Sequence, residues 1–320
     1  MLPIIDIAPL FHGDLDARRH VARQIGETCE TIGFLYVANH GVTDAVITNA
    51  RDAMEQFFAR PENEKRAIQR REHTLRGYIP TMPFGANHPD APPTIYEGFN
   101  LGVDASPDDP ETQATRGLYG ANIWPDAPAG FRDAITAYWQ GVDAVSKRLL
   151  GAFSLALGQD EGLLTSMFEK QLTNISLLHY HARPEMIDAP RDDSVAHRDT
   201  NAITVLLPSA VGGLEVQGSD GIYREAAPEP GCFVVNIGNM MECWSGDRFR
   251  STMHRVHPPR HVERYSIGFF AVPEYNTVVA PLPGLPVTGE PEDMAPRHAG
   301  EDLSGFVDYF DQQARELGAG

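Results

Sequence analysis

A histidine, an arginine and an aspartate stand just ahead of an apolar run, as His197, Arg198 and Asp199 precede the segment from Ala202 to Leu207. A buried charge is costly to desolvate unless it is paired or bound to a metal. His197 and Asp199 are two residues apart, so on an extended chain both side chains point to the same face. This spacing favours a shared task for the two side chains.

A second histidine can complete a metal site. His254 lies in the segment "STMHRVHPP", downstream of the apolar run. Two imidazoles and one carboxylate from adjacent strands form the facial triad that holds Fe(II) and leaves coordination positions open. A structural zinc site would take four protein ligands, usually with cysteine, and none of the three cysteines lies near His197 in the sequence. The pattern therefore predicts that His197, Asp199 and His254 bind iron.

An arginine and a serine follow in "RYSIGFF". Arg264 and Ser266 share one face of the predicted strand, and Tyr265 points to the other. A buried arginine needs an anion, and a guanidinium beside a hydroxyl is suited to hold a carboxylate. A metal site and an anion-binding arginine at the same opening of a barrel indicate an oxidase whose co-substrate is a small keto acid.

The composition limits the class of protein. The 320 residues include 42% hydrophobic and 22% charged side chains, which indicates a globular protein with an ample core. The formal net charge of −18 argues against a general nucleic-acid or anionic-membrane binder, because both need a basic surface. The cysteines have no framework spacing, and "MLPIIDIAPL" lacks the basic start of a signal peptide. We therefore expect a cytoplasmic protein without a membrane span.

The chain divides into two parts with different sequence patterns. The first half predicts helices, including one that stops at Gly33 and a long one with Phe131 to Phe153 on a single apolar stripe. Residues 69–126 are rich in Pro, Gly, Asp and Asn and predict long loops with short strands. From about residue 172, short apolar segments alternate with turn residues, which is typical of an antiparallel sandwich or jelly roll. The segment "DLSGFVDYFDQQARELGAG" predicts a closing helix.

The ordered set His197-x-Asp199, His254 and Arg264-x-Ser266 resembles that of the iron(II)/2-oxoglutarate-dependent dioxygenases. Within them the chain is most similar to the isopenicillin N synthase-like branch. The resemblance covers nearly the whole chain. It is carried in the first half by "PIIDIAPL", "GFLYVANHGV", "FFARPENEKR" and "RGYIP", and in the second by "LLHYHARPE", "VGGLEV", "VNIGNMM" and "MHRV".

The resemblance implies an α+β fold with a double-stranded β-helix (jelly-roll) core and flanking helices. It implies that the keto acid is 2-oxoglutarate, which binds the iron at one end and Arg264 and Ser266 at the other. With O2, it would be decarboxylated to succinate while a substrate is oxidised. Tyr180 matches a tyrosine that lines the active site in this branch. Arg76 and Tyr78, in "LRGYIP", are candidates to contact the substrate, and Phe270 is a candidate to line an apolar pocket.

The residue between the two ligands departs from many relatives, which have threonine there. Strand alternation directs Arg198 away from the metal, so we interpret it as solvent-facing or ion-paired, with Asp192 or Asp193 as the candidate partner. The alternative is a contact with a substrate carboxylate at the barrel rim.

The interpretation divides the chain into three parts. Residues 1–165 form a mainly helical N-terminal region with pocket loops at 69–126. Residues 166–280 form the jelly-roll core that holds Fe(II) and 2-oxoglutarate, and residues 281–320 form a loop and a C-terminal helix that packs on the core. We expect a monomer with a small-molecule substrate, and no nucleic-acid partner.

Three functions remain open at this point. The first is a 2-oxoglutarate-dependent oxygenase that hydroxylates or desaturates a small molecule. The second is an oxidase on the isopenicillin N synthase plan, which uses O2 without a keto acid on a peptide-like substrate and keeps the same Arg-x-Ser pair. The third is a non-catalytic small-molecule binding protein on the same scaffold, and an intact metal triad argues against it.

Overall fold

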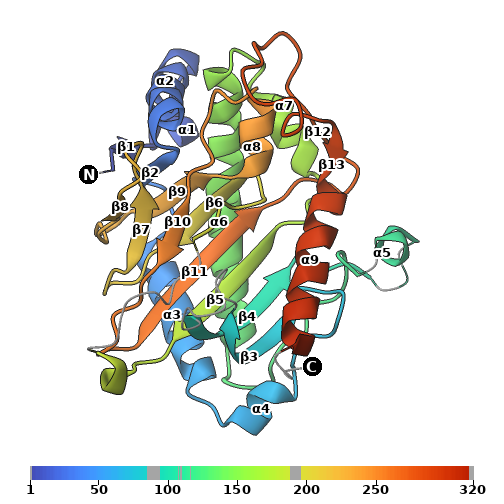
Figure 1. Cartoon of the computed structure of the whole chain (residues 1–320). Helices are drawn as coiled ribbons and strands as arrows, with labels where there is room; N and C mark the ends of the chain where they lie inside the picture. Colours follow the sequence, from blue (N-terminus) through green and yellow to red (C-terminus); the bar gives the residue numbers. More distant parts are fainter. Residues whose placement is uncertain are drawn as a thin grey trace.

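The computed structural model describes residues 2–84, 94–106, 108, 110–115, 117–187 and 196–316. Its centre is a large sheet with a small sheet on one face and helices on the other (Figure 1). The predicted α+β class with a double-stranded β-helix core is confirmed. No helix in these described ranges is both long and apolar enough to cross a membrane.

The large sheet has eight strands, and all neighbours are antiparallel except the first pair. Its spatial order is β1 (Ile4–Asp6), β2 (Phe34–Ala38), β9 (Phe233–Ile237), β6 (Ile203–Leu207), β11 (Arg264–Ala271), β5 (Asn174–Tyr180), β4 (Thr94–Gly102) and β3 (Gly77–Phe84). The small antiparallel sheet has the order β10 (His254–Val256), β7 (Leu214–Gln217) and β8 (Tyr223–Glu225), and β12 (Val278–Val279) pairs with β13 (Arg297–His298). The chain therefore passes repeatedly between the two sheets as it builds the core.

Helices from both ends of the chain surround these sheets. They are α1 (Pro9–His12), α2 (Leu15–Thr31), α3 (Asp44–Phe58), α4 (Glu62–Arg66), α5 (Pro110–Ala114), α6 (Phe131–Ala156), α7 (Gly162–Thr165), α8 (Asn239–Trp244) and α9 (Ala299–Glu316), with 3-10 turns η1 (Ser166–Phe168) and η2 (Pro184–Met186). The predicted apolar stripe on α6 is confirmed, because the large apolar residues that recur at helical spacing between Phe131 and Phe153 are buried.

The prediction for residues 69–126 was wrong in one respect. Instead of short strands among loops, the described part of this segment contains β3 and β4, which extend the large sheet beyond β5. The turn-forming residues of this segment obscured the alternation along β4, where Phe99 and Leu101 are buried beside Gly98 and Gly102. Such strands are stabilised by their neighbours more than by their own composition.

Side chains of the large sheet alternate between two faces. On β6 and β9 the paired residues Thr204 and Asn236 point to the inner face, where both donate to Asp199. Their neighbours Val205 and Val235 point to the outer face and share one hydrophobic core with α6. The inner face of β2 and β9 packs against the small sheet in a second cluster. The polar side chains that orient Asp199 therefore lie on the inner face, and the outer face packs against the main hydrophobic core.

Gly33 tests how tightly α2 is fixed against the rest of the fold. It ends the helix in the left-handed region at φ +66°, and an added Cβ would lie 1.9 Å from the carbonyl oxygen of Arg250. Gly33→Ala should lower the free energy of unfolding by about 2–4 kcal/mol, from backbone strain plus this clash. Gly158→Ala is the control, because φ is +72° and nothing lies within 4 Å of the added carbon. Equal losses in urea denaturation would contradict the prediction.

Candidate active site

The structure brings His197, Asp199 and His254 together. The backbone N–H groups of His197 and His254 donate to each other's carbonyl oxygens at 3.0 Å, which aligns the two residues as a cross-strand pair. Oδ1 of Asp199 lies 3.6 Å from Nε2 of each histidine. These separations are too long for direct hydrogen bonds and suit three donors that surround one ion.

Inner-face side chains orient the Asp199 carboxylate. Its Oδ2 atom accepts hydrogen bonds from the Thr204 hydroxyl at 2.5 Å and from Nδ2 of Asn236 at 2.7 Å, so Oδ1 is the atom that faces the histidines. Burial would raise the pKa of Asp199, but His254, His197 and the bond from Thr204 hold that pKa well below its usual range. The carboxylate is therefore ionised and oriented before any ligand arrives.

His254 presents one ring nitrogen to the same point. Its Nδ1 lies 3.1 Å from the carbonyl oxygen of Thr252, and a hydrogen on Nδ1 leaves Nε2 with its lone pair toward Asp199. Burial lowers the pKa of His254, and the Asp199 carboxylate opposes that shift. Phe34 packs edge-on against the imidazole at 5.2 Å between ring centroids. These contacts fix the tautomer and the ring plane that a metal ligand needs.

Arg264 is almost wholly buried on β11. Its Nε donates to the carbonyl oxygen of Gly212 at 2.9 Å, and Nη1 donates to Oγ of Ser266 at 3.1 Å. Its guanidinium lies over the ring of Tyr180 at 4.7 Å from the centroid. Within the described residues no carboxylate lies at ion-pair distance from Arg264. Burial lowers the pKa of Arg264, but a guanidinium keeps its charge under all ordinary conditions, so this site is suited to an anion.

Comparisons with known proteins cover both halves of the chain. Residues 2–127 match the family model described as the N-terminal part of the non-haem dioxygenase in morphine synthesis, and residues 172–273 match the 2OG-Fe(II) oxygenase superfamily. The chain is 31% identical over 300 residues to the 2-oxoglutarate-Fe(II) type oxidoreductase hxnY of Emericella nidulans, across 92% of this chain and 86% of that protein. It is 30% identical over 297 residues to gibberellin 20 oxidase 2 of Oryza sativa, across 88% and 70%.

The chain belongs to the 2OG-Fe(II) oxygenase superfamily. As predicted, this oxygenase is an oxidoreductase that depends on Fe(II), 2-oxoglutarate and O2. Of the three functions left open by the sequence, the comparisons bear out the first. The donor set fits the metal, because two imidazoles and one carboxylate are the set on which Fe(II) oxygenases rely.

Solved structures agree on the fold. A full-length protein of Neurospora crassa, solved in complex with alpha-KG and thymine, aligns with a TM-score of 0.84 at 23% identity over 97% of each chain. JOX2, in complex with 2OG, Fe and JA, aligns with a TM-score of 0.75 at 25% identity over 96% of this chain and 84% of that one.

The remaining predicted residues of the oxygenase lie in different places. Tyr180 is buried on the inner face beside Arg264, and Phe270 is on the same face of β11, where its ring lies against Gly268. Arg76 is buried and donates to the carbonyl oxygens of Leu118 and Val103. Tyr180 and Phe270 thus share the inner face with Arg264 and Thr204, while the Arg76 guanidinium binds two loop carbonyls.

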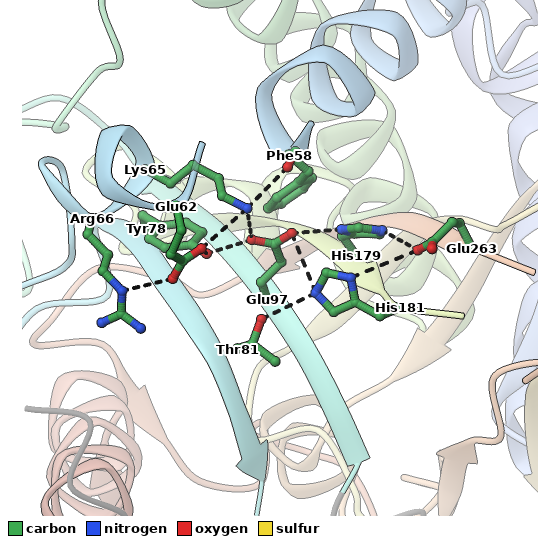
Figure 2. A network of polar contacts seen from close by, with 10 residues as sticks. All are labelled: Phe58, Glu62, Lys65, Arg66, Tyr78, Thr81, Glu97, His179, His181 and Glu263. Carbon is green, nitrogen blue, oxygen red and sulfur yellow. Dashed lines mark hydrogen bonds and ion pairs between the residues drawn. The ribbon is translucent and has the colours of Figure 1, made fainter. Parts of the chain in front are cut away.

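Tyr78 is not brought to the site. It is fully buried, and its hydroxyl lies 2.5 Å from Oε2 of Glu97 and 2.9 Å from Oε2 of Glu62, in the polar cluster of Figure 2. A tyrosine so engaged packs the interior. Its interpretation as a substrate contact came from the flanking segment, and β3 directs this side chain to the outer face.

Arg198 is half exposed and pairs with Glu242, with 3.5 Å between Nη1 and Oε2. This agrees with the interpretation of Arg198 as an ion-paired residue. The two aspartates considered as its partners, Asp192 and Asp193, lie outside the described residues.

Asn100 on β4 was not among the residues predicted from the sequence. This residue is buried, with 7% of its surface exposed, and its Oδ1 has no hydrogen-bond partner within the described structure. It lies on the inner face, level with Ser176 of β5 and Gly268 of β11. The sequence signal for Asn100 was the alternation in "EGFNLG". If these residues had been assigned to a strand, alternation would have placed Asn100 and Phe99 on opposite faces of the sheet.

The hydroxyl of Thr204 offers a direct test of how the carboxylate is held. Thr204→Val keeps the shape of the side chain but removes the donor to Asp199, so Fe(II) affinity should fall about 10- to 100-fold. Competition with a metal chelator would measure it, and a thermal melt of the metal-free protein would check the fold. Unchanged iron affinity would show that Asn236 alone orients the carboxylate.

Proposed function

We propose that this oxygenase hydroxylates or desaturates a small organic molecule with release of succinate and CO2. His197, Asp199 and His254 hold the iron, and Arg264, Ser266 and Tyr180 hold the far carboxylate of 2-oxoglutarate. The observation that carries the proposal is a buried guanidinium without a carboxylate partner among the described residues, on the same sheet face as Thr204, which orients Asp199 of the His–Asp–His set.

Fe(II) supplies the chemistry by activating O2 at the expense of the keto acid, which opens a route to oxidise an unreactive C–H bond. The protein itself would orient the metal ligands and the co-substrate and would exclude water. Thr204 and Asn236 set the carboxylate ligand, and Thr252 sets the tautomer of His254. Arg264, aligned by the Gly212 carbonyl and Ser266, would hold the far carboxylate of 2-oxoglutarate.

The substrate would occupy the inner face beside the co-substrate, between Phe270 and Asn100. Adjacent strands lie about 4.8 Å apart, and β4 is two strands from β11, so Asn100 is roughly 10 Å from the strand that carries Arg264. The unsatisfied Oδ1 of Asn100 would accept a hydrogen bond from a substrate N–H or O–H group. Arg76 remains a candidate to contact the substrate near Asn100, although its main role is to bind the two loop carbonyls. Tyr78 would affect the substrate only indirectly, through the packing of β3.

The three parts of the chain take different roles in this proposal. Residues 1–165 build the outer layer and the pocket edge, residues 166–280 carry the iron and co-substrate, and residues 281–320 cover the core with α9. We further propose that the chain acts as a cytoplasmic monomer of the isopenicillin N synthase-like branch on a small-molecule substrate, without nucleic acid. The buried, unpaired state of Cys29, Cys232 and Cys243 supports a reducing compartment.

An anaerobic titration tests the proposal. Fe(II) protein mixed with 2-oxoglutarate should give the weak visible charge-transfer band of an iron-chelated keto acid, and the band should saturate. Arg264→Ala should keep iron but weaken 2-oxoglutarate binding by about 2–5 kcal/mol, because one partner of a buried charge pair is lost. Arg18→Ala is the control, since Arg18 pairs with Glu161 on the helical layer. Iron binding without any band would indicate the oxidase that uses no keto acid.

Asn100→Leu tests the substrate wall through stability and ligand binding, so the measurement needs no substrate. Removal of a buried amide whose Oδ1 lacks a partner should raise the free energy of unfolding by about 1–3 kcal/mol and leave iron and 2-oxoglutarate binding unchanged. Asn122→Leu is the matched control, because both ends of the Asn122 amide bond the backbone of Gly102, and its loss should destabilise. A destabilised Asn100→Leu protein would mean that this amide serves the fold.

A further inference from the structure

A polar cluster lies directly behind the Arg264 site, on the outer face of the large sheet. Three neighbouring strands pair in register there, so that Tyr96, Tyr180 and Arg264 form one row across β4, β5 and β11. The adjacent residues, Glu97 on β4, His179 on β5 and Tyr265 on β11, form a second row. Because side chains alternate, the first row faces the inner site and the second faces α3 and α4.

Glu97 is the centre of this cluster. The carboxylate is fully buried, and its Oε2 accepts from Nζ of Lys65 and lies beside the Tyr78 hydroxyl, both at 2.5 Å. Its Oε1 lies 2.8 Å from Nδ1 of His179 and 3.6 Å from Nε2 of His181. Figure 2 shows these side chains converging on Glu97 from α4, β3 and β5. Burial would raise the pKa of Glu97, but the bonds from His179, Lys65 and Tyr78 lower it to about 2.

His179 links the three strands at the level of Arg264. While Nδ1 bonds Glu97 on β4, Nε2 lies 2.6 Å from Oε2 of Glu263, the residue that immediately precedes Arg264. Its ring also stacks on Tyr265 of β11, with 4.3 Å between centroids and 4° between planes. Both neighbours of Arg264 in the sequence are therefore held by one imidazole.

A metal ion is a poor explanation for the cluster, although Glu97, His179 and His181 gather ligand atoms. In the His197 site the carboxylate stands 3.6 Å from each imidazole, with space for an ion between them. Here Glu97 and His179 are already in direct hydrogen-bond contact, and the other carboxylate oxygen is neutralised by Lys65. The Lys65 ammonium therefore already supplies the positive charge that a metal ion would bring to this cluster.

Stability alone does not account for it either. The adjoining outer-face row, Phe99, Leu177 and Ile267, is wholly apolar and fully buried, so the same layer packs without charges. Buried ion pairs are seldom more stabilising than apolar side chains of similar volume, but they do fix geometry. A geometric task is therefore the better explanation for the charges in the Glu97 row.

We propose that the Glu97–His179–Glu263 network is a positioning device for the co-substrate clamp. It holds β4, β5 and β11 in register at one level, and thereby fixes Tyr180 and Arg264 on the opposite face. His179, Glu97 and Glu263 touch neither iron nor 2-oxoglutarate and act through Arg264. The inference rests on the proposed role of Arg264.

His179→Gln and Glu263→Ala test the network, and the second variant safeguards against misfolding because the Glu263 side chain is 46% exposed. Both should raise the dissociation constant of 2-oxoglutarate, followed by the charge-transfer band, by about 2- to 30-fold. Fe(II) affinity, measured by chelator competition, should stay within about twofold, and catalysis at saturating 2-oxoglutarate should change less than KM.

Asp311→Asn is the matched control. Asp311 is another fully buried carboxylate, paired with Arg70 and with the backbone N–H of His73, but it belongs to α9 and not to the clamp. It should lower stability and leave 2-oxoglutarate affinity unchanged. If His179→Gln and Glu263→Ala behave like this control, the network is only structural and the inference falls. If the wild type itself shows iron binding without a 2-oxoglutarate band, the proposed function falls first, and the inference with it.

Discussion

Arg264 carries a buried positive charge whose contacts in the described structure are a carbonyl oxygen, a hydroxyl and an aromatic face. These neighbours orient the guanidinium but cannot neutralise it, so the interior of this sheet is prepared for an anion. In the proposed function, the His–Asp–His set binds the iron that the other end of this anion chelates. The rest of the fold keeps these two features at a fixed separation.

Strand alternation lets one sheet meet two opposite demands. The inner face carries the donors Thr204 and Asn236 that orient Asp199, together with the unsatisfied Oδ1 of Asn100, whereas the outer face buries the apolar side of α6. The Glu97 row is an exception on the outer face, and it lies behind the clamp rather than elsewhere. Under the proposed function, rigidity at that level would keep the Arg264 guanidinium in place, since small displacements in an active site are costly to catalysis.

Much of the site follows from short-range pattern. The spacing His197-x-Asp199 and Arg264-x-Ser266 places each pair on one face, because alternation along a strand is local. The helical stripe from Phe131 to Phe153 and the stop at Gly33 are likewise local signals, and the structure agrees with both. For β3 and β4 the sequence predicted only short strands among loops, because Pro, Gly and polar residues masked their alternation. Pairing of β4 with β5 and of β3 with β4 supplies the order that propensity did not indicate.

The sequence by itself determined which residue types could bind a metal and an anion, and on which side of a strand each pair lies. Only the tertiary structure decided that His254 would pair with His197, that Glu97 would meet His179 and Lys65, and that Tyr78 would face outward. These outcomes depend on register between segments distant in the chain. A shift of one residue moves every side chain to the other face, so register is set by the whole fold rather than by any one segment.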